Sequence, residues 1–494
     1  MQMTERLVVS EPYYFTEPMS HCGYCKGKKP KRQNNFSLQS WYNYHSDKHD
    51  NDNTANCTMG VQVELMSVEM YDKLCNMGFR RSGRFLYKPD LLRNCCRLYT
   101  IRTTAEKVHI SKDIKSCVKR FKKAVTAQQT TKGRGTPYNY MKEIVEAEND
   151  SQVFHTRFEP AFFSEEKYKL FAKYQERVHD DHDHSPKSFK RFLCDSPFSP
   201  DVQKGTKQEW DQLNGWKNST TEYFKRLGPA HECYFYEDKL IALAVIDILP
   251  SGISSVYFIW DPDYHKWSLG KLSALRELTI CSKINRKFYY MGYYIDDCPK
   301  MNYKGHYGGE LMDICNFKFA PLEFLQQYIE DGNFFVLSDE SDLNDEPDLN
   351  DRLTKHPTTW QELEKLHNVA ENIYGFNGKA FSTADKAADR LSQQEIPYRK
   401  DAVRDICHQN TNKKDIYRIP NVAPGLLPLH EIADLVSEGK FDLLNNRLLL
   451  FDTTDGRIRP MARFTDESPQ IKKAICNLVR LFGLQNTRDA LLII

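Results

Sequence analysis

The chain has 494 residues, of which 40% are hydrophobic and 12% aromatic, and its formal net charge at pH 7 is +2. This composition is typical of a folded protein of two or three domains and excludes a disordered or low-complexity chain. Residues 1–20 hold no long apolar run and no later stretch approaches a membrane span, so neither a secretory leader nor a membrane partner is expected. The 14 cysteines are irregularly spaced, which predicts reduced thiols in the cytoplasm or nucleus.

The motif HCGYCKG contains a pair of closely spaced thiols, Cys22 and Cys25. A zinc ion or an iron-sulfur centre needs four thiolate or imidazole ligands. Cys95 and Cys96 in LLRNCCRLYTIR are the candidates for the other two, but neighbouring side chains of an extended segment point to opposite faces, so the chain must turn sharply there. The sequence therefore predicts a four-cysteine metal site. The alternatives are His21 as a ligand, or an exposed pair beside an inert buried Cys-Cys.

Residues 107–134 form a basic stretch in which Asp113 is the single acid. Ile110, Ile114 and Phe121 recur there at helical spacing, which predicts an amphipathic helix with a basic outer face. Such a face favours contact with nucleic-acid phosphates, and a solvated surface helix is the alternative. The predicted contacts are Lys112, Lys115, Lys119, Arg120, Lys122 and Lys123, and the stretch continues to Lys132 and Arg134.

The middle of the chain has the clearest pattern. Ser164 is placed to cap a helix, and residues 233–264 contain three runs of β-branched and aromatic residues separated by turns. Leucines at helical spacing follow at 269–278, and residues 287–295 return to strand composition. Strands followed by a helix and another strand predict the α+β class with a mostly antiparallel sheet. The order β-β-β-α-β is that of the GNAT acyltransferase core, which is a likeness of fold alone.

Two stretches are predicted to be solvated. HDDHDHS at 179–185 follows the end of a helix and precedes Ser-Pro, so we expect a loop rather than a metal site. SDESDLNDEPDLND at 338–351 is acidic and nearly free of large apolar side chains, which predicts a flexible linker. Helical patterns near 358–372 and 470–483 follow it.

Together the motifs resemble those of arginyl-tRNA–protein transferases in their fungal form. The stretches that carry the resemblance are HCGYCKG, GFRRSGRFLYKP (78–89), CCRLYTIR, FAKYQ (171–175), DKLIALAVIDILPSGISSVYFIWDPDY, SLGKLSALREL and YYMGYYIDDCPKMNYKGHY (289–307). They span most of residues 20–310, and the basic stretch is an insertion relative to the shorter animal forms. The C-terminal region matches no known pattern beyond a loose likeness around ADLVSEGKFDLLNNRLLLF.

The resemblance implies a fold, a reaction and partners. The fold is a GNAT-like acyltransferase core with an N-terminal cysteine cluster that holds zinc or an iron-sulfur centre. Arginine on the 3′ end of its tRNA is transferred to the α-amine of proteins that begin with Asp, Glu or oxidised Cys. The product is an N-degron for ubiquitin-dependent degradation. The implied partners are arginyl-tRNA, proteins with acidic N-termini and components of the N-degron ubiquitin ligase machinery.

Five domains are predicted. They are an N-terminal cysteine-cluster domain (1–105), a basic insertion that contacts tRNA (106–150), a GNAT-like catalytic domain (151–335), an acidic linker (336–352) and a helical C-terminal extension (353–494).

A pocket that binds the acidic first residue of a protein substrate needs fixed positive charge. The positively charged arginyl group on the tRNA needs carboxylates near it. The predicted substrate-binding residues are Arg80, Arg81, Arg84, Arg102, Asp247, Lys300 and Lys304. Arg81 and Lys300 are the strongest of the cations. Surface solvation is the alternative for any one cation, and a paired structural charge is the alternative for Asp247 and for Glu277.

The attacking nucleophile is the α-amine of the protein substrate, which titrates near pH 8, roughly, and the ester is already activated. The enzyme therefore has to orient the partners, accept a proton and stabilise the oxyanion, and needs no nucleophile of its own. The predicted catalytic residues are Glu277 or Asp296 as proton acceptor, with a water as the alternative. Tyr294 and Tyr303 are the predicted oxyanion donors, with packing as their alternative role.

Three other functions compete. An acetyltransferase with the same core would bind coenzyme A through a glycine-rich turn at a helix start, but DPDYHKWSLGKLS has the single glycine Gly270, so no coenzyme A is expected. The second alternative is the bacterial relative that transfers leucine, and the cysteine quartet and the extra fungal segments favour arginine instead. A tRNA-binding adaptor without activity leaves the intact stretch 289–307 unexplained.

Overall fold

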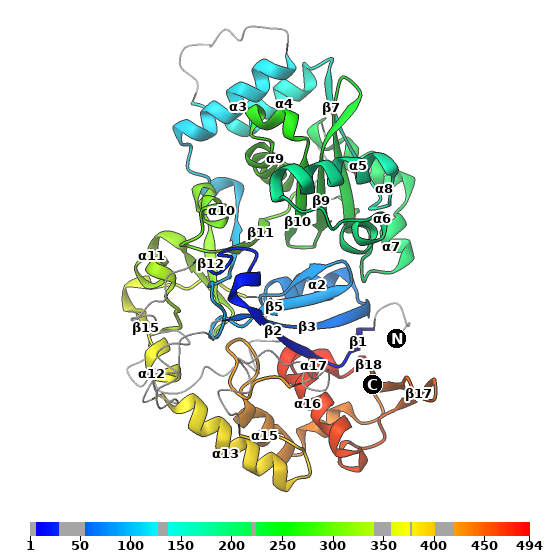
Figure 1. Cartoon of the computed structure of the whole chain (residues 1–494), viewed down its shortest axis with the longest axis vertical. Helices are drawn as coiled ribbons and strands as arrows, with labels where there is room; N and C mark the ends of the chain where they lie inside the picture. Colours follow the sequence, from blue (N-terminus) through cyan, green and yellow to red (C-terminus); the bar gives the residue numbers. More distant parts are fainter. Residues whose placement is uncertain are drawn as a thin grey trace.

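The computed structural model of the chain describes residues 6–28, 55–126, 137–218, 224–339, 357–375, 378–400 and 418–494. Figure 1 shows two large sheets with helices packed around them. The predicted α+β class is confirmed. None of the helices in these ranges combines the length and the hydropathy that crossing a bilayer requires.

The first sheet contains the strands predicted for the middle of the chain. Its eight strands follow the order β13, β12, β6, β11, β10, β9, β8, β7. All neighbours are antiparallel except β10 and β11. Glu237 and Asp238, between β8 and β9, both have positive φ, as a tight hairpin turn requires. The strands are β6 (Tyr99–Thr103), β7 (Phe154–Glu159), β8 (Gly228–Tyr236), β9 (Lys239–Ile248), β10 (Gly252–Trp260), β11 (Phe288–Tyr294), β12 (Glu310–Asp313) and β13 (Lys318–Pro321).

Helices cover both faces of the first sheet (Figure 1). α5 (Glu165–Tyr174) begins after Ser164, which caps it as predicted, and packs against β9 and β10. α9 (Leu269–Lys283) confirms the predicted leucine helix and packs against β10 and β11. α3 (Lys112–Val125) and α4 (Tyr140–Asn149) pack on each other and on α9. The basic insertion is therefore joined to the helix that covers the centre of the sheet.

β10 and β11 pair over three residues and then diverge. The last pair joins Ser254 to Tyr290. Beyond it each strand carries a bulge, at Val256 against β9 and at Met291–Gly292 against β6. Residues 255–258 of β10 are half-buried although the strand lies inside the sheet. Bulges are frequent beside active sites because they end pairing and redirect side chains, so this divergence is the candidate site.

The second sheet brings distant parts of the chain together. Its order is β17, β16, β18, β1, β3, β5, β4, and β2 also pairs with β3. β18 runs parallel to β1, and β4 lies against β10 of the first sheet. The two sheets therefore meet close to the divergence of β10 and β11. The strands are β1 (Val8–Ser10), β2 (Tyr13–Pro18), β3 (Ala55–Leu65), β4 (Arg80–Ser82), β5 (Phe85–Pro89), β16 (Leu449–Asp452), β17 (Arg457–Pro460) and β18 (Leu491–Ile493).

The C-terminal region is only partly helical, because β16, β17 and β18 belong to the second sheet. The helix predicted near 470–483 is confirmed as α16 (Pro469–Phe482). The helix predicted near 358–372 is confirmed only at its end, where α12 (Ala370–Tyr374) begins; before it, Glu362 has a left-handed φ of 49° and a short strand follows. The acidic linker lies outside the described residues from 340 onward.

The other elements are α2 (Val68–Cys75), α6 (Pro186–Phe189), α7 (Pro200–Lys204), α8 (Lys207–Asn214), α10 (Pro299–Asn302), α11 (Leu322–Ile329), β14 (Leu337–Ser338), β15 (His367–Asn368), α12 (Ala370–Tyr374), α13 (Lys379–Gln393), α15 (Leu429–Ser437) and α17 (Leu484–Thr487).

Candidate active site and metal centre

The four predicted metal ligands lie together. The thiols of Cys22, Cys25, Cys95 and Cys96 are all within 4.8 Å of one another. The Sγ atoms are 4.0 Å apart for Cys22 and Cys96 and 3.8 Å apart for Cys25 and Cys95. Bonds of ~2.3 Å from a zinc ion to four thiolates separate the sulfurs of a tetrahedron by roughly 3.8 Å. The quartet therefore fits one tetrahedral ion, and no second group of this kind occurs in the described ranges.

Local hydrogen bonds shape the second half of the quartet. Tyr14 of β2 donates to the Asp90 carboxylate over 2.9 Å, and Arg93 is 2.8 Å from the same carboxylate. The chain then bends at both Cys95 and Cys96, which supplies the sharp turn that shared ligation requires. These contacts join β2, which precedes the first cysteine pair, to the segment that carries the second.

The thiols perturb one another. Hydrogen bonds from Cys95 and Cys96 lower the pKa of the Cys22 thiol, and Cys22 in turn raises the pKa of both partners. One thiolate is thus stabilised by two thiols. Because thiolates are the ligating form, a metal that binds here displaces the shared protons.

Glu277 of α9 lies at the divergence of β10 and β11. Ser273 donates to its Oε1 over 2.6 Å, and burial together with the nearby charge of Glu277 raises the pKa of the Tyr289 hydroxyl. Burial raises the pKa of Glu277 to about 7, and Oε2 has no hydrogen-bond partner among the described residues. A carboxyl group with these properties can exchange a proton near neutral pH.

The structure separates the two predicted oxyanion donors. Burial and the charge of Glu277 raise the pKa of the Tyr303 hydroxyl, which keeps it protonated and able to donate. Tyr294 instead donates to Asp296 over 2.9 Å, and Asp296 also accepts from Gln326 over 3.0 Å. Tyr303 therefore lies near Glu277, whereas Tyr294 and Asp296 form a pair of their own.

Two predicted cations converge on the β11 bulge without an acidic partner. Arg80 donates to the carbonyls of Cys75 and Phe79 and, over 3.4 Å, to that of Gly292. Lys304 donates to the Tyr293 carbonyl over 2.7 Å.

Neither cation forms an ion pair with a described carboxylate. Burial, together with the nearby charge of Arg80, lowers the pKa of Lys304 to about 7. Arg80 is 5% exposed, and Lys304 is half-buried. Desolvated positive charge without a counterion is costly, so this arrangement is suited to an incoming anion.

Arg81 and Asp247, which were predicted to bind opposite substrates, instead bind each other. The guanidinium of Arg81 makes two hydrogen bonds of 2.7 Å to the Asp247 carboxylate, and both side chains are buried. The interpretation of Arg81 as a free charge is therefore wrong, and Asp247 is the paired structural charge that the sequence left open. Since neighbouring side chains of a strand point to opposite faces, the pair anchors β4 on β9 and leaves Arg80 directed at β11.

The remaining predicted cations lie elsewhere. Arg102 is buried between the rings of Phe288 and Phe319 and bonds Glu310 over 2.6 Å. Arg84 is exposed and forms an ion pair with Glu64. Both are paired, which counts against a role in substrate binding.

Lys300, at the start of α10, is exposed. Burial lowers the pKa of His179, and the charges of Lys300 and Lys26 lower it further. Two cations from separate motifs, Lys300 and Lys26, therefore lie near His179.

Comparison with known proteins identifies the family of this chain. Family models described as "Arginine-tRNA-protein transferase, N terminus" and "Arginine-tRNA-protein transferase, C terminus" match residues 20–116 and 166–313. The Saccharomyces cerevisiae protein named Arginyl-tRNA--protein transferase 1 is 48% identical over 500 residues, which cover 99% of each chain. The chain belongs to the arginine-tRNA-protein transferase family. The predicted family is thereby confirmed, and its members are aminoacyltransferases.

Two more distant relatives match parts of the chain. The Arabidopsis thaliana protein named Arginyl-tRNA--protein transferase 2 is 35% identical over 190 residues, which are 36% of this chain and 29% of the relative. The Stutzerimonas stutzeri protein named Aspartate/glutamate leucyltransferase is 32% identical over 243 residues, which are 48% of this chain and 76% of the relative.

In this member of the family, the basic helix α3 is packed rather than isolated. Its Ile114, Cys117 and Phe121 are buried, and its outer face is exposed. Lys122 differs from the other predicted contacts because it pairs with Glu143 over 2.8 Å. Lys112, Lys115, Lys119, Arg120 and Lys123 are exposed, and Lys132 and Arg134 lie outside the described residues.

The HDDHDHS segment is a surface loop, as predicted. Its histidines pair with single acids, His182 with Asp180 and His184 with Glu176, and no three of its side chains gather around a common point.

Sequence reasoning missed the residues that complete the site. Ser273 and Tyr289, which contact Glu277, and Lys26 beside the cysteine pair were not predicted. One signal was available, because Gly292 interrupts the aromatic strand KFYYMGYYI and such glycines often mark bulges. Serine and tyrosine inside apolar elements carry no comparable signal.

Proposed function

We propose that this chain transfers arginine from arginyl-tRNA to the α-amine of proteins that begin with Asp, Glu or oxidised Cys. The observation that carries the proposal is the pair of cations Arg80 and Lys304, which meet at the β11 bulge with no described acid beside them. A carboxylate or sulfinate on the first residue of the substrate supplies the missing counterion. The transferred arginine then marks the protein for the N-degron ubiquitin ligase machinery of the cytoplasm or nucleus.

Two relatives support this substrate class. The yeast relative, which matches over 99% of both chains, is named for arginyl-tRNA. The bacterial relative is named for aspartate and glutamate, and it matches 48% of this chain. The name of the bacterial relative thus gives acidic residues as the acceptors, although the amino acid that it transfers is leucine. This favours the arginyl over the leucyl reaction for this chain while keeping the acidic acceptor.

The catalytic step needs a proton acceptor and a donor to the oxyanion. The free amine of the substrate attacks the ester carbonyl, the C–N bond forms, and the bond to the 3′ oxygen of the tRNA breaks. Glu277 accepts the proton that the amine loses and returns it to the departing oxygen, since its pKa of about 7 suits both directions. Tyr303 donates to the oxyanion, and Tyr289 and Ser273 hold the Glu277 carboxylate in place.

The core that carries these residues is GNAT-like in strand order, with its reaction centre at the divergence of β10 and β11. The start of α9 argues against coenzyme A. Arg120 of α3 donates to Ser268 at that helix start, and Lys271 bonds Asp113 of α3. Side chains of the basic helix therefore contact the start of α9, where an acetyltransferase would present free amides to a pyrophosphate.

The tRNA binds along α3. Its exposed lysines follow one face of a helix that packs against α9, so phosphates bound there lie beside the helix that carries Glu277. Residues 106–150 form this contact, residues 151–335 the catalytic domain and residues 336–352 a linker. The N-terminal domain and residues 353–494 share the second sheet.

Cys22, Cys25, Cys95 and Cys96 hold the metal. Their compact spacing favours one tetrahedral ion over an iron-sulfur cluster, in which several irons and sulfides separate the thiolates. A single ion with four protein ligands has no open position, and its contribution is to fix the loop that carries Lys26.

The test is transfer of labelled arginine to matched peptides. Wild-type protein is expected to label a peptide that begins with Asp and not the same peptide that begins with Ala. Lys304→Gln is expected to raise the KM for the Asp peptide by roughly 10–100-fold, the equivalent of one lost charge-assisted hydrogen bond, with unchanged affinity for tRNA. Equal labelling of the two peptides would refute acidic recognition, and transfer from leucyl-tRNA instead would favour the bacterial reaction.

A further inference from the structure

A cavity of about 810 Å³ lies beside the candidate active site. One wall is the β4–β5 hairpin, with Ser82 and Phe85, and the other is the segment 171–195, with Phe171 and Phe192. The lining therefore combines three phenylalanine rings with polar and charged side chains. Nothing in the proposed reaction uses this space.

The walls of the cavity are built with unusual backbone. Two π-helical turns, Gln175–His179 and Lys190–Cys194, lie in the segment that forms one wall. On the other wall Gly83 approaches the second turn so closely that a Cβ on it would lie 2.1 Å from the Arg191 carbonyl oxygen. π-Helical turns are rare and occur often at functional sites. Gln175 Oε1, which belongs to a lining residue, is buried and has no hydrogen-bond partner among the described residues.

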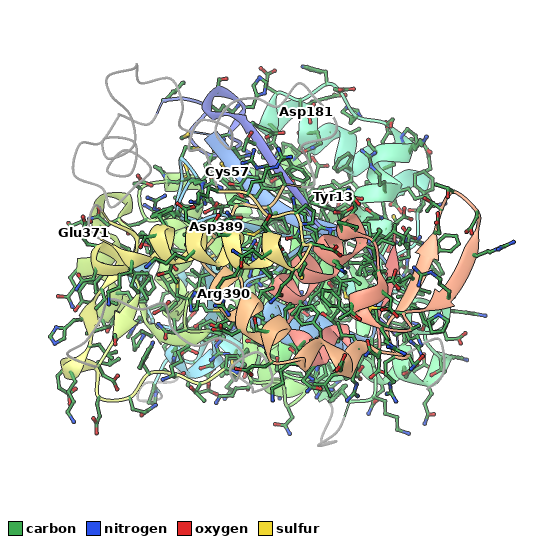
Figure 2. All side chains as sticks on the ribbon, turned by 90° about the horizontal axis from the view of Figure 1, so that it is seen from below. Tyr13, Cys57, Asp181, Glu371, Asp389 and Arg390 are labelled. Atoms are coloured by element: carbon green, nitrogen blue, oxygen red, sulfur yellow. The ribbon has the colours of Figure 1, made fainter. Side chains whose placement is uncertain are left out.

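The charges at the rim do not balance. Asp181, Asp183 and Asp195 line the cavity, and none of them forms an ion pair with a described lysine or arginine. Arg84 is neutralised by Glu64, which leaves Arg191 as the lining arginine without such a partner. Asp181 lies at the edge of the molecule in Figure 2, where its carboxylate can meet a ligand.

Two elements link the cavity to the candidate active site. Ser82 lies two residues after Arg80 on β4, a distance of roughly 6–7 Å along a strand. On the opposite wall the Phe192 ring contacts Tyr257 with centroids 5.0 Å apart, and Tyr257 belongs to the half-buried part of β10. The cavity and the candidate active site therefore share β4 and adjoin at the half-buried part of β10.

We propose that this cavity binds the residues of the protein substrate that follow its acceptor residue, and that it prefers basic side chains there. The proposal rests on the function proposed above. Aromatic rings supply contact area for an extended peptide, and the three carboxylates attract lysine or arginine and repel acids. The site thus adds a second preference, of opposite sign, to the requirement for an acidic first residue.

The experiment compares three acceptors with the full chain. They are the dipeptide Asp-Ala, a longer peptide with Asp first and arginines at positions 3 to 5, and the same peptide with glutamates there. Wild-type protein is expected to show a KM about tenfold lower for the basic than for the acidic peptide, with a difference that shrinks as salt is added. The double variant Asp181→Asn, Asp183→Asn is expected to lose the difference and to keep its rate with Asp-Ala. The matched control is Asp455→Asn, an exposed acid on the hairpin between β16 and β17.

Each outcome of this experiment either supports or overturns the proposed role of the cavity. If the basic and acidic peptides have equal KM values in the wild type, or if the double variant slows Asp-Ala as much as the longer peptide, the cavity has no such role. If no acceptor is labelled, the proposed function fails, and fluorescence anisotropy with the two longer peptides still tests the cavity. Preferential binding of the basic peptide that the double variant abolishes would then support it, and equal binding would overturn it.

Discussion

At the scale of single residues, adjacent side chains have opposite roles. Arg80 and Arg81 look equivalent in GFRRSGR, yet one is neutralised by Asp247 and the other has no described acid beside it. The sequence does not show which arginine is paired with an acid, because that depends on which strand lies on each side of β4. The quartet of thiols, in contrast, was predictable, since cysteines with this spacing have few roles in a reduced protein.

The position of Glu277 leads to a prediction for pH. Its raised pKa of about 7 means that the carboxylate accumulates as pH rises through 7, so kcat is expected to rise over the same range. Glu277→Gln is expected to lower kcat by about 10²–10⁴-fold and to remove this dependence. The pH profile of single-turnover transfer measures both.

The free energy of unfolding, measured against pH, is the control for Glu277→Gln. A buried carboxyl whose pKa is raised in the folded state loses stability as pH rises from its unfolded value toward 7, because only the folded state must bury the charge. Glu277→Gln is therefore expected to be more stable than wild type above pH 7 and not at pH 4. A variant that loses stability at pH 8 would show that the carboxylate has a structural role instead.

The thiols give a prediction about metal. Cys95→Ser is expected to lower the metal content of the purified protein, measured by mass spectrometry of the elements, because it removes one of four ligands. Cys57→Ser is the matched control, since Cys57 is also buried but lies outside the quartet. Unchanged metal in the first variant, or equal loss in both, would reject the quartet as the site.

At the scale of elements, the strands and helices of the middle region follow from their patterns. Runs of β-branched residues became β8, β9 and β10, and the leucine stripe became α9. What could not be predicted is the divergence of β10 and β11, because it depends on two bulges and on a strand from the N-terminal region. The helix expected near 358–372 formed only at its end, because the periodic apolar residues before it pack as loop and short strand, and local spacing alone does not distinguish these.

The basic helix carries a prediction of its own. Reversing the charge of Lys115, Lys119 and Lys123 is expected to weaken tRNA binding and to reduce the slope of log affinity against log salt by about 2. Lys122 is omitted because it already pairs with Glu143. The control reverses Lys386 and Lys440, exposed lysines of the C-terminal region. Filter binding over a salt series distinguishes the sets, and equal slopes would show that α3 is only a solvated surface.

At the scale of the whole molecule, buried cations join the C-terminal region to the rest. Lys88 and Arg93 donate to the carbonyls of Gly425 and Val422, and Arg480, which is itself in the C-terminal region, donates to that of Asn421 in the same loop. Each of these cations donates to a backbone carbonyl of residues 421–425, so the loop is held through its backbone more than through its side chains. These contacts could not be predicted from the sequence, because every residue carries a carbonyl acceptor.

The parallel pairing of β1 with β18 has a consequence for synthesis. Residues 8–10 leave the ribosome long before their neighbour in the sheet, residues 491–493, which are translated more than 480 positions later. During that interval one edge of β1 has no strand beside it, in the same sheet that supports the cysteine segment. A nascent chain stalled before residue 449 is therefore expected to bind a holdase chaperone longer than the finished protein does.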